Sequence, residues 1–293
     1  MQQQEQTFQH FNLNAKDWNE QAKSTNYNTI VDRNNAVIDS VRAHGRVKDF
    51  LDVGCGSGQL TLQIADLGIT STGIDFAPEM IALCEENKSA KGSTAIFNQV
   101  SVFDCKALPN SLDVISAQGF IEYISVNELH QFIEFCGESL RTGGLAVVGS
   151  RNRLFNVFSL NDYTAMEAEL GTIPQLVFEA MNIQRAQSLT SLFEALKKSF
   201  DADHPVSHPF TGVKVATRYQ YAPSELIKKF EKAGFEPEKI YPINFQPIPQ
   251  SLLSNGTWAE LKDGVSNFVS NSSDKGFQFV PFSSSFVLAM KKI

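Results

Sequence analysis

The sequence contains no CxxC pair, no apolar run long enough to span a membrane and no surplus of positive charge. Its scattered cysteines argue against a zinc ribbon, a dithiol redox motif or a disulfide framework, and predict free thiols at Cys55, Cys84, Cys105 and Cys136. The first residues, MQQQEQTFQHFNLN, lack the basic flank and apolar core of a signal peptide. We therefore expect a cytoplasmic protein without a membrane partner.

The charge balance gives no global basic surface. The 293 residues include 25 Lys and Arg against 32 Asp and Glu, a formal net charge of -7. Because phosphate backbones are bound by clustered Lys and Arg, nucleic acid is not expected as a main partner. With 42% hydrophobic residues, the composition is that of a globular protein with a substantial core.

Strand and helix patterns alternate along most of the chain. Helical spacing covers 14–21, 30–44, 58–67, a segment from Pro78, 126–140 and 223–233, and strand patterns cover 47–53, 70–75, 94–99, 112–117, 145–150, 235–244 and SSSFVLAMKK. This alternation predicts an α/β, doubly wound (Rossmann-like) fold with a mostly parallel seven-stranded sheet. Residues 151–222 carry helical runs without strands and predict a helical insertion after the fifth strand.

The stretch LDVGCGSGQL places Gly54, Gly56 and Gly58 between a strand and a helix. Glycine permits positive φ and lets a ligand approach backbone N–H groups at a helix N-terminus, although a tight turn alone would also use it. Asp75 ends the second predicted strand, where a carboxylate can accept both hydroxyls of a ribose or cap the helix that follows.

The glycine spacing is GxGxG, whereas a dinucleotide fingerprint would read GxGxxG. Asp52 stands beside this loop, where its carboxylate would repel a pyrophosphate and attract an ammonium group. The loop therefore favours a ligand that carries a nucleoside and an amino group.

Five motifs in order resemble the class I S-adenosylmethionine-dependent methyltransferases. They are LDVGCGSG (51–58), GIDFAPEMI (73–81), VFD followed by LP (102–109), LDVI with FIEYI (112–124) and LRTGG (140–144). The later segments YAPSEL and AGF are similar to the last helix and strand of that family. The resemblance implies S-adenosyl-L-methionine as the cofactor and methyl transfer as the activity.

The resemblance assigns the cofactor's methionine and ribose portions to Gly54, Cys55 and Gly56, and its amino group to Asp52. Asp75 would hold the ribose hydroxyls. Arg33 resembles the basic residue that some members aim at the methionine carboxylate, although an exposed helix arginine is an equal alternative.

The adenine would lie against Phe76, near Met80 of the same motif, unless this phenylalanine belongs to the core. Asp104 would accept from the adenine amino group beside the backbone N–H of Cys105, or would be an exposed loop carboxylate. Gln118 would border the sulfonium where the acceptor enters.

No residue identifies itself as a catalytic base or metal ligand. Glu122 and Tyr123 lie on the acceptor side by analogy, but the metal-site pattern of polyprenyl-quinol O-methyltransferases is largely missing around them. His204 and His208 are each followed by proline, which disfavours metal geometry on a helix.

The resemblance divides the chain into N-terminal helices or a lid (1–46), a cofactor-binding core (47–150), an insertion with the acceptor pocket (151–222) and the remainder of the core (223–293). Trp18 and Tyr27 would cover the cofactor or pack the first helices onto the sheet. The insertion's apolar side chains would line a pocket for a small apolar or amphipathic acceptor or pack on the sheet edge, namely Leu154, Phe155, Phe158, Tyr163, Met166, Leu176, Phe178, Met181 and Phe193.

The predicted reaction is methyl transfer to an oxygen or nitrogen atom of a small molecule. Three other functions stay open from the sequence: a dinucleotide oxidoreductase, a non-catalytic binding or scaffolding protein with the same fold, and a protein methyltransferase. The oligomeric state is not predicted.

Overall fold

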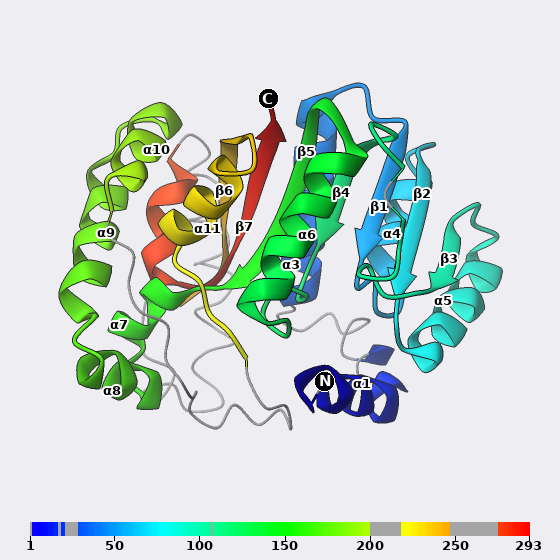
Figure 1. Cartoon of the computed structure of the whole chain (residues 1–293), viewed down its shortest axis with the longest axis horizontal. Helices are drawn as coiled ribbons and strands as arrows, with labels where there is room; N and C mark the ends of the chain where they lie inside the picture. Colours follow the sequence, from blue (N-terminus) through cyan, green and yellow to red (C-terminus); the bar gives the residue numbers. More distant parts are fainter. Residues whose placement is uncertain (1, 17–18, 21–28, 107, 200–217, 247–274) are drawn as a thin grey trace, which may run out of the picture.

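A computed structural model describes residues 2–16, 19–20, 29–106, 108–199, 218–246 and 275–293 (Figure 1). Within these ranges a single seven-stranded sheet has the order β3-β2-β1-β4-β5-β7-β6. Its strands are β1 (Asp49–Val53), β2 (Thr70–Asp75), β3 (Ile96–Gln99), β4 (Leu112–Ala117), β5 (Leu140–Arg151), β6 (Phe235–Phe245) and β7 (Ser283–Lys292).

Strands β1 to β5 are parallel, whereas β7 runs antiparallel between β5 and β6. The prediction of a mostly parallel, doubly wound sheet is confirmed. Strand β1 pairs with both β2 and β4, so the strand order reverses at this point. Such a switch point opens a crevice beyond the carboxyl ends of the strands, where doubly wound folds bind their ligands.

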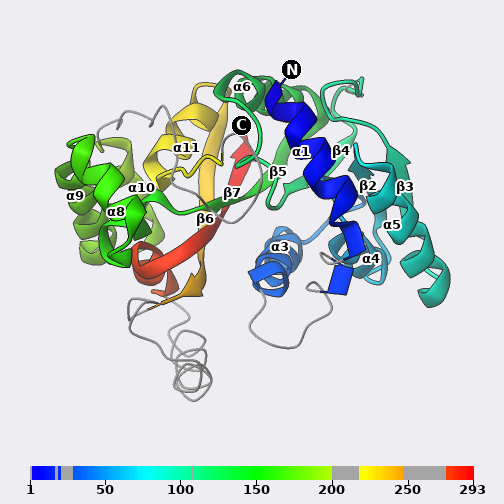
Figure 2. The ribbon, with the colours of Figure 1, turned by 90° about the horizontal axis from the view of Figure 1, so that it is seen from below.

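Helices cover both faces of the sheet (Figure 2). Because side chains alternate along a strand, Phe50 and Val147 face α3 (Thr29–His44) and α4 (Gln59–Ala65). Their neighbours Leu51 and Val148 face the opposite layer, which holds α6 (Val126–Ser139) and α11 (Pro223–Glu231). Helix α5 (Pro78–Lys91) packs against β2 and β3.

The segment between β5 and α11 is mainly helical over residues 153–199, which confirms the predicted helical insertion after the fifth strand, while its residues 218–222 form no helix. Its elements are η1 (Arg153–Phe155), α7 (Asn156–Ser159), α8 (Asp162–Glu169), α9 (Ile173–Arg185) and α10 (Leu189–Lys197). A second short helix, η3 (Gly276–Phe282), packs against α9 and leads into β7. Among the described residues, no helix is both long and apolar enough to cross a membrane.

Of the helix expected over 14–21, the described residues 15–16 and 19–20 are helical. The sequence analysis missed a further helix before it, α1 (Gln2–Leu13), within the Gln-rich segment for which no helix was expected. Gln and Glu are good helix formers, and Phe8 and Phe11 lie three positions apart on one face, so this segment can fold against the protein. Figure 1 shows α1 beyond the carboxyl-terminal edge of the sheet.

Candidate functional site

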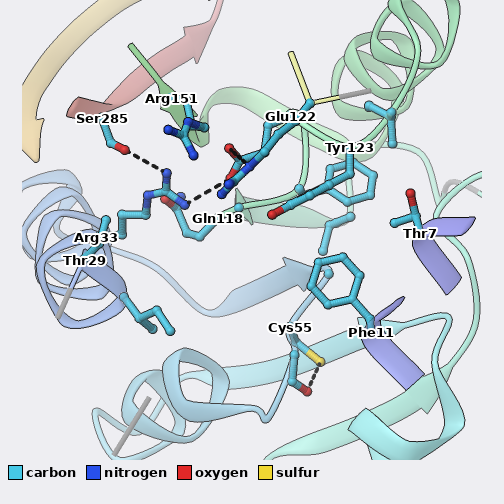
Figure 3. A pocket seen from close by; sticks show the side chains of 18 of the residues that line it. Thr7, Phe11, Thr29, Arg33, Cys55, Gln118, Glu122, Tyr123, Arg151 and Ser285 are labelled. Atoms are coloured by element: carbon cyan, nitrogen blue, oxygen red, sulfur yellow. Dashed lines mark hydrogen bonds and ion pairs between the residues drawn. The ribbon is translucent and has the colours of Figure 1, made fainter. Parts of the chain in front are cut away.

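A cavity of about 1130 Å³ lies at the carboxyl-terminal edge of the sheet, above the switch point between β1 and β4. Ten of the eleven predicted cofactor residues line it, the exception being Cys105. The ten are Arg33, Asp52, Gly54, Cys55, Gly56, Asp75, Phe76, Met80, Asp104 and Gln118. The fold therefore collects side chains from distant segments around one space (Figure 3).

The two later glycines of the turn serve different purposes. Gly58 has φ +79°, and a Cβ there would lie 2.7 Å from Phe97 and 2.9 Å from the Sγ of Cys84, so the close packing of this turn requires glycine. Gly56 also has positive φ, at +53°, but a Cβ there would meet nothing within 4 Å. The turn thus leaves open space beside Gly56, on the cavity side.

Asp75 ties the glycine turn to the start of α5. Its Oδ2 accepts from the N–H of Gly56 at 3.1 Å, and its Oδ1 accepts from the N–H of Ala77 at 2.9 Å. Ala77, not Asp75, occupies the N-cap position of α5. Burial raises the pKa of Asp75 to about 6, against the opposing effect of its backbone hydrogen bonds. Each carboxylate oxygen keeps a lone pair for a ligand.

Asp52 is a buried carboxylate, 2% exposed, on the cavity wall. Thr61 on α4 donates to its Oδ2 at 2.9 Å. Burial raises the pKa of Asp52 to about 7, against its hydrogen bonds to Thr61 and Ser116. A cationic group placed here would favour the ionised form.

The wall predicted for the adenine is partly apolar. Phe76 contacts Phe8 of α1 edge-on, with 5.5 Å between ring centroids, and Met80 is 3% exposed in the same cluster. Asp104 lies on the cavity wall and is exposed. Cys105 lies outside the wall, and its N–H donates to the carbonyls of Ser101 and Val102. The structure therefore does not place Cys105 where the sequence analysis expected it.

On the other half of the cavity, Glu122 is surrounded by arginines. Its Oε1 lies 3.6 Å from the Nη1 of Arg33, and its Oε2 lies 3.3 Å from the Nε of Arg218. Burial alone would raise the pKa of Glu122, but the charges of Arg218, Arg33 and Arg151 lower it. Glu122 is thus an ionised anchor among cations.

Arg33 is buried, so the alternative of an exposed helix arginine is wrong. It belongs to the inner stripe of α3 that also holds Val37, Ser40 and Val41, because these positions recur at helical spacing. Its Nη2 donates to the Oγ of Ser285 on β7 at 3.1 Å (Figure 3).

Other polar groups complete this half. Gln118 follows β4 and donates through Nε2 to the carbonyl of Val147 at 2.9 Å, while its Oε1 has no partner among the described residues. Burial raises the pKa of Tyr123 to about 12, with a contribution from Glu122. Burial also raises the pKa of Tyr163.

The insertion contributes a different lining from the one predicted. Of the nine apolar residues named from the sequence, only Phe155 and Tyr163 reach the cavity. Leu154, Leu176 and Phe193 are buried in the core, whereas Phe178 and Met181 are exposed. The polar Asn156, Ser159 and Asn161 line the cavity instead.

Among the lining residues that the sequence analysis did not name are Phe11, Arg151 and Arg218. The only sequence signal for Arg151 is its place at the end of an apolar strand pattern, VVGSR, since strand ends form the ligand edge of such sheets. Trp18, Tyr27, His204 and His208 lie outside the described residues.

Comparisons with known proteins agree with this geometry. Residues 50–144 match the family described as "Methyltransferase domain". A ubiquinone biosynthesis O-methyltransferase of Rhizobium leguminosarum bv. trifolii (strain WSM2304) is 25% identical over 139 residues, which cover 47% of this chain and 54% of that protein. The chain thus spans about half the length of the curated relatives it matches first.

Two solved structures share the fold across the whole chain. The magnesium protoporphyrin IX methyltransferase from Synechocystis PCC 6803 with bound SAM has a TM-score of 0.59 at 10% identity, covering 100% of this chain and 98% of that one. The cyclase SpnF has a TM-score of 0.56 at 17% identity, covering 100% and 96%. At these identities the likeness concerns the fold alone.

Residues 50–144 therefore match a methyltransferase domain, and the strand order is that of the class I methyltransferase fold, so the resemblance found in the motifs is confirmed.

Proposed function

We propose that this protein transfers a methyl group from S-adenosyl-L-methionine to an oxygen or nitrogen atom of a small molecule. The supporting observation is one cavity with two chemically distinct halves. Asp52, Asp75 and the glycine turn form the first half, and Glu122 with its arginines forms the second. The volume of about 1130 Å³ exceeds the roughly 300–1,000 Å³ of an ordinary small-molecule pocket, which leaves room for two ligands.

The first half fits the proposed cofactor. The open space at Gly56 admits a ligand to the backbone, and the free lone pairs of Asp75 can accept ribose hydroxyls. Asp52 can balance an ammonium group, and Phe76 can lie against an apolar ring face. When bound, S-adenosyl-L-methionine supplies a methyl group activated by a positively charged sulfur.

The chain contributes positioning more than proton transfer. Holding two reactants in line can supply effective molarities of about 10⁵ M or more. Among the described residues of the second half, Glu122 has a lowered pKa and Tyr123 a pKa of about 12, so neither is a base poised near neutral pH. These residues therefore suit an acceptor whose reacting atom can attack the methyl group without first losing a proton to the protein.

Calorimetric titration with S-adenosylhomocysteine and with NAD tests the cofactor. We expect binding of S-adenosylhomocysteine and none of NAD. Transfer of a labelled methyl group to a small molecule then separates the enzyme from a non-catalytic binding protein, and labelling of protein substrates would point to a protein methyltransferase.

A matched pair of variants tests the site. Asp75→Ala removes a charged hydrogen-bond acceptor and should weaken the binding of S-adenosylhomocysteine by about 1–3 kcal/mol. Asp66→Ala removes an exposed carboxylate at the end of α4, with Oδ2 3.9 Å from Lys91 Nζ, and should bind like the wild type. Equal affinities for both variants would contradict the assigned cofactor site.

A further inference from the structure

The second half of the cavity carries more positive than negative charge. Arg33, Arg151 and Arg218 all act on the one carboxylate of Glu122, and all four residues line the cavity. Arg33 and Arg218 form its two ion pairs. The third arginine, Arg151, acts on Glu122 through its charge but forms no ion pair with a carboxylate among the described residues.

Arg151 is fixed by its backbone and turned toward this space. It ends β5, where it pairs with Ser285 of β7, and its carbonyl accepts from the N–H of Tyr221 at 3.2 Å. Figure 3 shows its guanidinium beside the ion pair of Arg33 with Glu122. The strand therefore holds a cation on the wall of the second half of the cavity.

The donors of Arg151 are incompletely satisfied. Its Nε is buried without a hydrogen-bond partner in the described part of the chain, and the buried hydroxyl of Tyr163 is likewise unpartnered there. The guanidinium carbon lies 5.9 Å from the centroid of the Tyr163 ring, at the outer limit of a cation–π contact. Such a contact satisfies no N–H group, and buried donors without acceptors are costly.

A count of charges narrows the ligand. Three arginines and one glutamate leave two positive charges on the protein. This step rests on the proposed function and on the family resemblance, which directs Arg33 at the methionine carboxylate of the cofactor. Of the protein's charges, one positive charge then remains on the acceptor side. A charge in such a partly buried position is stabilised by a counter-charge.

We infer that the methyl acceptor is a small molecule with a carboxylate group, and that Arg151 binds this carboxylate. The guanidinium fork matches two carboxylate oxygens. The hydroxyl of Tyr163 can donate to the same group. With S-adenosylhomocysteine bound, whose sulfur is neutral, a phosphate monoester would bring close to two negative charges into a space that balances one.

The remaining lining agrees with a molecule that is polar at one end. Phe120 and Phe155 supply apolar surface, while Asn156 and Gln220 supply amides joined by a hydrogen bond of 2.6 Å. A carboxylate at Arg151 with an apolar body against the phenylalanines would use both surfaces.

The test uses the wild-type protein saturated with S-adenosylhomocysteine and a panel of small monocarboxylates, from acetate and hexanoate to benzoate and 4-hydroxybenzoate. Each acid is paired with its neutral primary amide, and phenyl phosphate represents the phosphate class. Calorimetry and the rise in melting temperature report binding. We expect at least one acid to bind about 10- to 150-fold more tightly than its amide, the range for hydrogen bonds to a charged group.

Variants assign the effect to the arginine. Arg151→Gln should abolish the preference for the acid while S-adenosylhomocysteine still binds, and Arg151→Lys should restore part of it because the charge remains. Arg42→Gln removes one charge from an exposed site on α3 and should keep the preference. The proposal is overturned if no acid binds better than its amide, if phenyl phosphate alone binds, or if Arg151→Gln keeps the preference. If the wild-type protein does not bind S-adenosylhomocysteine at all, that result would instead refute the proposed function.

Discussion

Phe11 of the first helix meets Tyr123 edge-on, with 5.1 Å between the ring centroids and 89° between the ring planes. Tyr123 follows Glu122, so this contact joins α1 to the second half of the cavity. Phe8 makes a similar contact with Phe76 in the first half. Helix α1 is therefore attached to both halves through aromatic side chains.

Phe11→Ala should weaken the attachment of α1 and so weaken the binding of S-adenosylhomocysteine. An aromatic pair contributes about 0.5–1.5 kcal/mol beyond its buried area, which corresponds to about 2- to 12-fold in affinity. Leu13→Ala is the control, because Leu13 lies on the same helix and is 83% exposed. Calorimetry compares the two, and equal losses would show that α1 has no specific contact with the ligand site.

The affinity for S-adenosylhomocysteine should fall as the pH is lowered from 7.5 to 5. Burial raises the pKa of Asp52 to about 7 and that of Asp75 to about 6, from an ordinary value of 3.8. The free protein therefore holds protons that a ligand with an ammonium and ribose hydroxyls must displace. The loss reaches about tenfold per pH unit for each proton released.

The same shifts act on the unliganded fold with a defined sign. Both pKa values are raised on folding, so the two groups reduce stability as the pH rises from about 4 to about 7. In the variant Asp52→Asn, the affinity for S-adenosylhomocysteine should lose the part of its pH dependence near 7 and keep the part near 6. A wild-type affinity that is constant between pH 5 and 7.5 would contradict this assignment.

Alanine at Gly56 should mainly reduce ligand affinity, whereas alanine at Gly58 should mainly reduce the stability of the fold. Gly56→Ala places a methyl group in open space and should reduce S-adenosylhomocysteine affinity at least about tenfold, with a stability loss of only about 1–2 kcal/mol from its positive φ. Gly58→Ala adds a clash with Phe97 and Cys84 and should destabilise the fold by roughly 2–5 kcal/mol. Denaturant unfolding and calorimetry measure both effects. Similar stabilities would refute the packing role of Gly58.

Glu167→Gln should destabilise the insertion strongly. Its carboxylate accepts from Nε and Nη2 of Arg153, both at 2.9 Å, and the two side chains are 0% and 1% exposed. Removing one partner of a buried ion pair costs about 3–5 kcal/mol. Glu194→Gln breaks the exposed pair with Lys197, 3.6 Å apart, and should change the free energy of unfolding by no more than about 0.5 kcal/mol. Chemical denaturation measures the free energy of unfolding of both variants. A small effect of Glu167→Gln would show that the ion pair with Arg153 contributes little to stability.

The half of the cavity that we propose for the cofactor was largely predictable, because its residues lie within short, local motifs. The strand pattern, the glycine spacing and the terminal Asp75 occur in neighbouring segments whose geometry the backbone sets. Cys105 was misplaced because the sequence does not show that its N–H completes a local turn. Helix α1 was missed because its polar sequence gives little periodicity until its two phenylalanines find partners on the folded protein.

The half that we propose for the acceptor depends on contacts between distant segments. Four separate segments of the chain supply Arg33, Glu122, Arg151 and Arg218, and nothing local indicates that they meet. For the apolar residues of the insertion, a pocket lining and packing on the sheet edge both stayed open, because composition cannot distinguish a ligand wall from a core.

By itself, the sequence determined the alternation of strands and helices, the glycine turn and the carboxylates beside it, since these follow from backbone conformation and local spacing. Only the tertiary structure decided which charges share a cavity and which phenylalanines close it, because long-range packing sets side-chain proximity and burial.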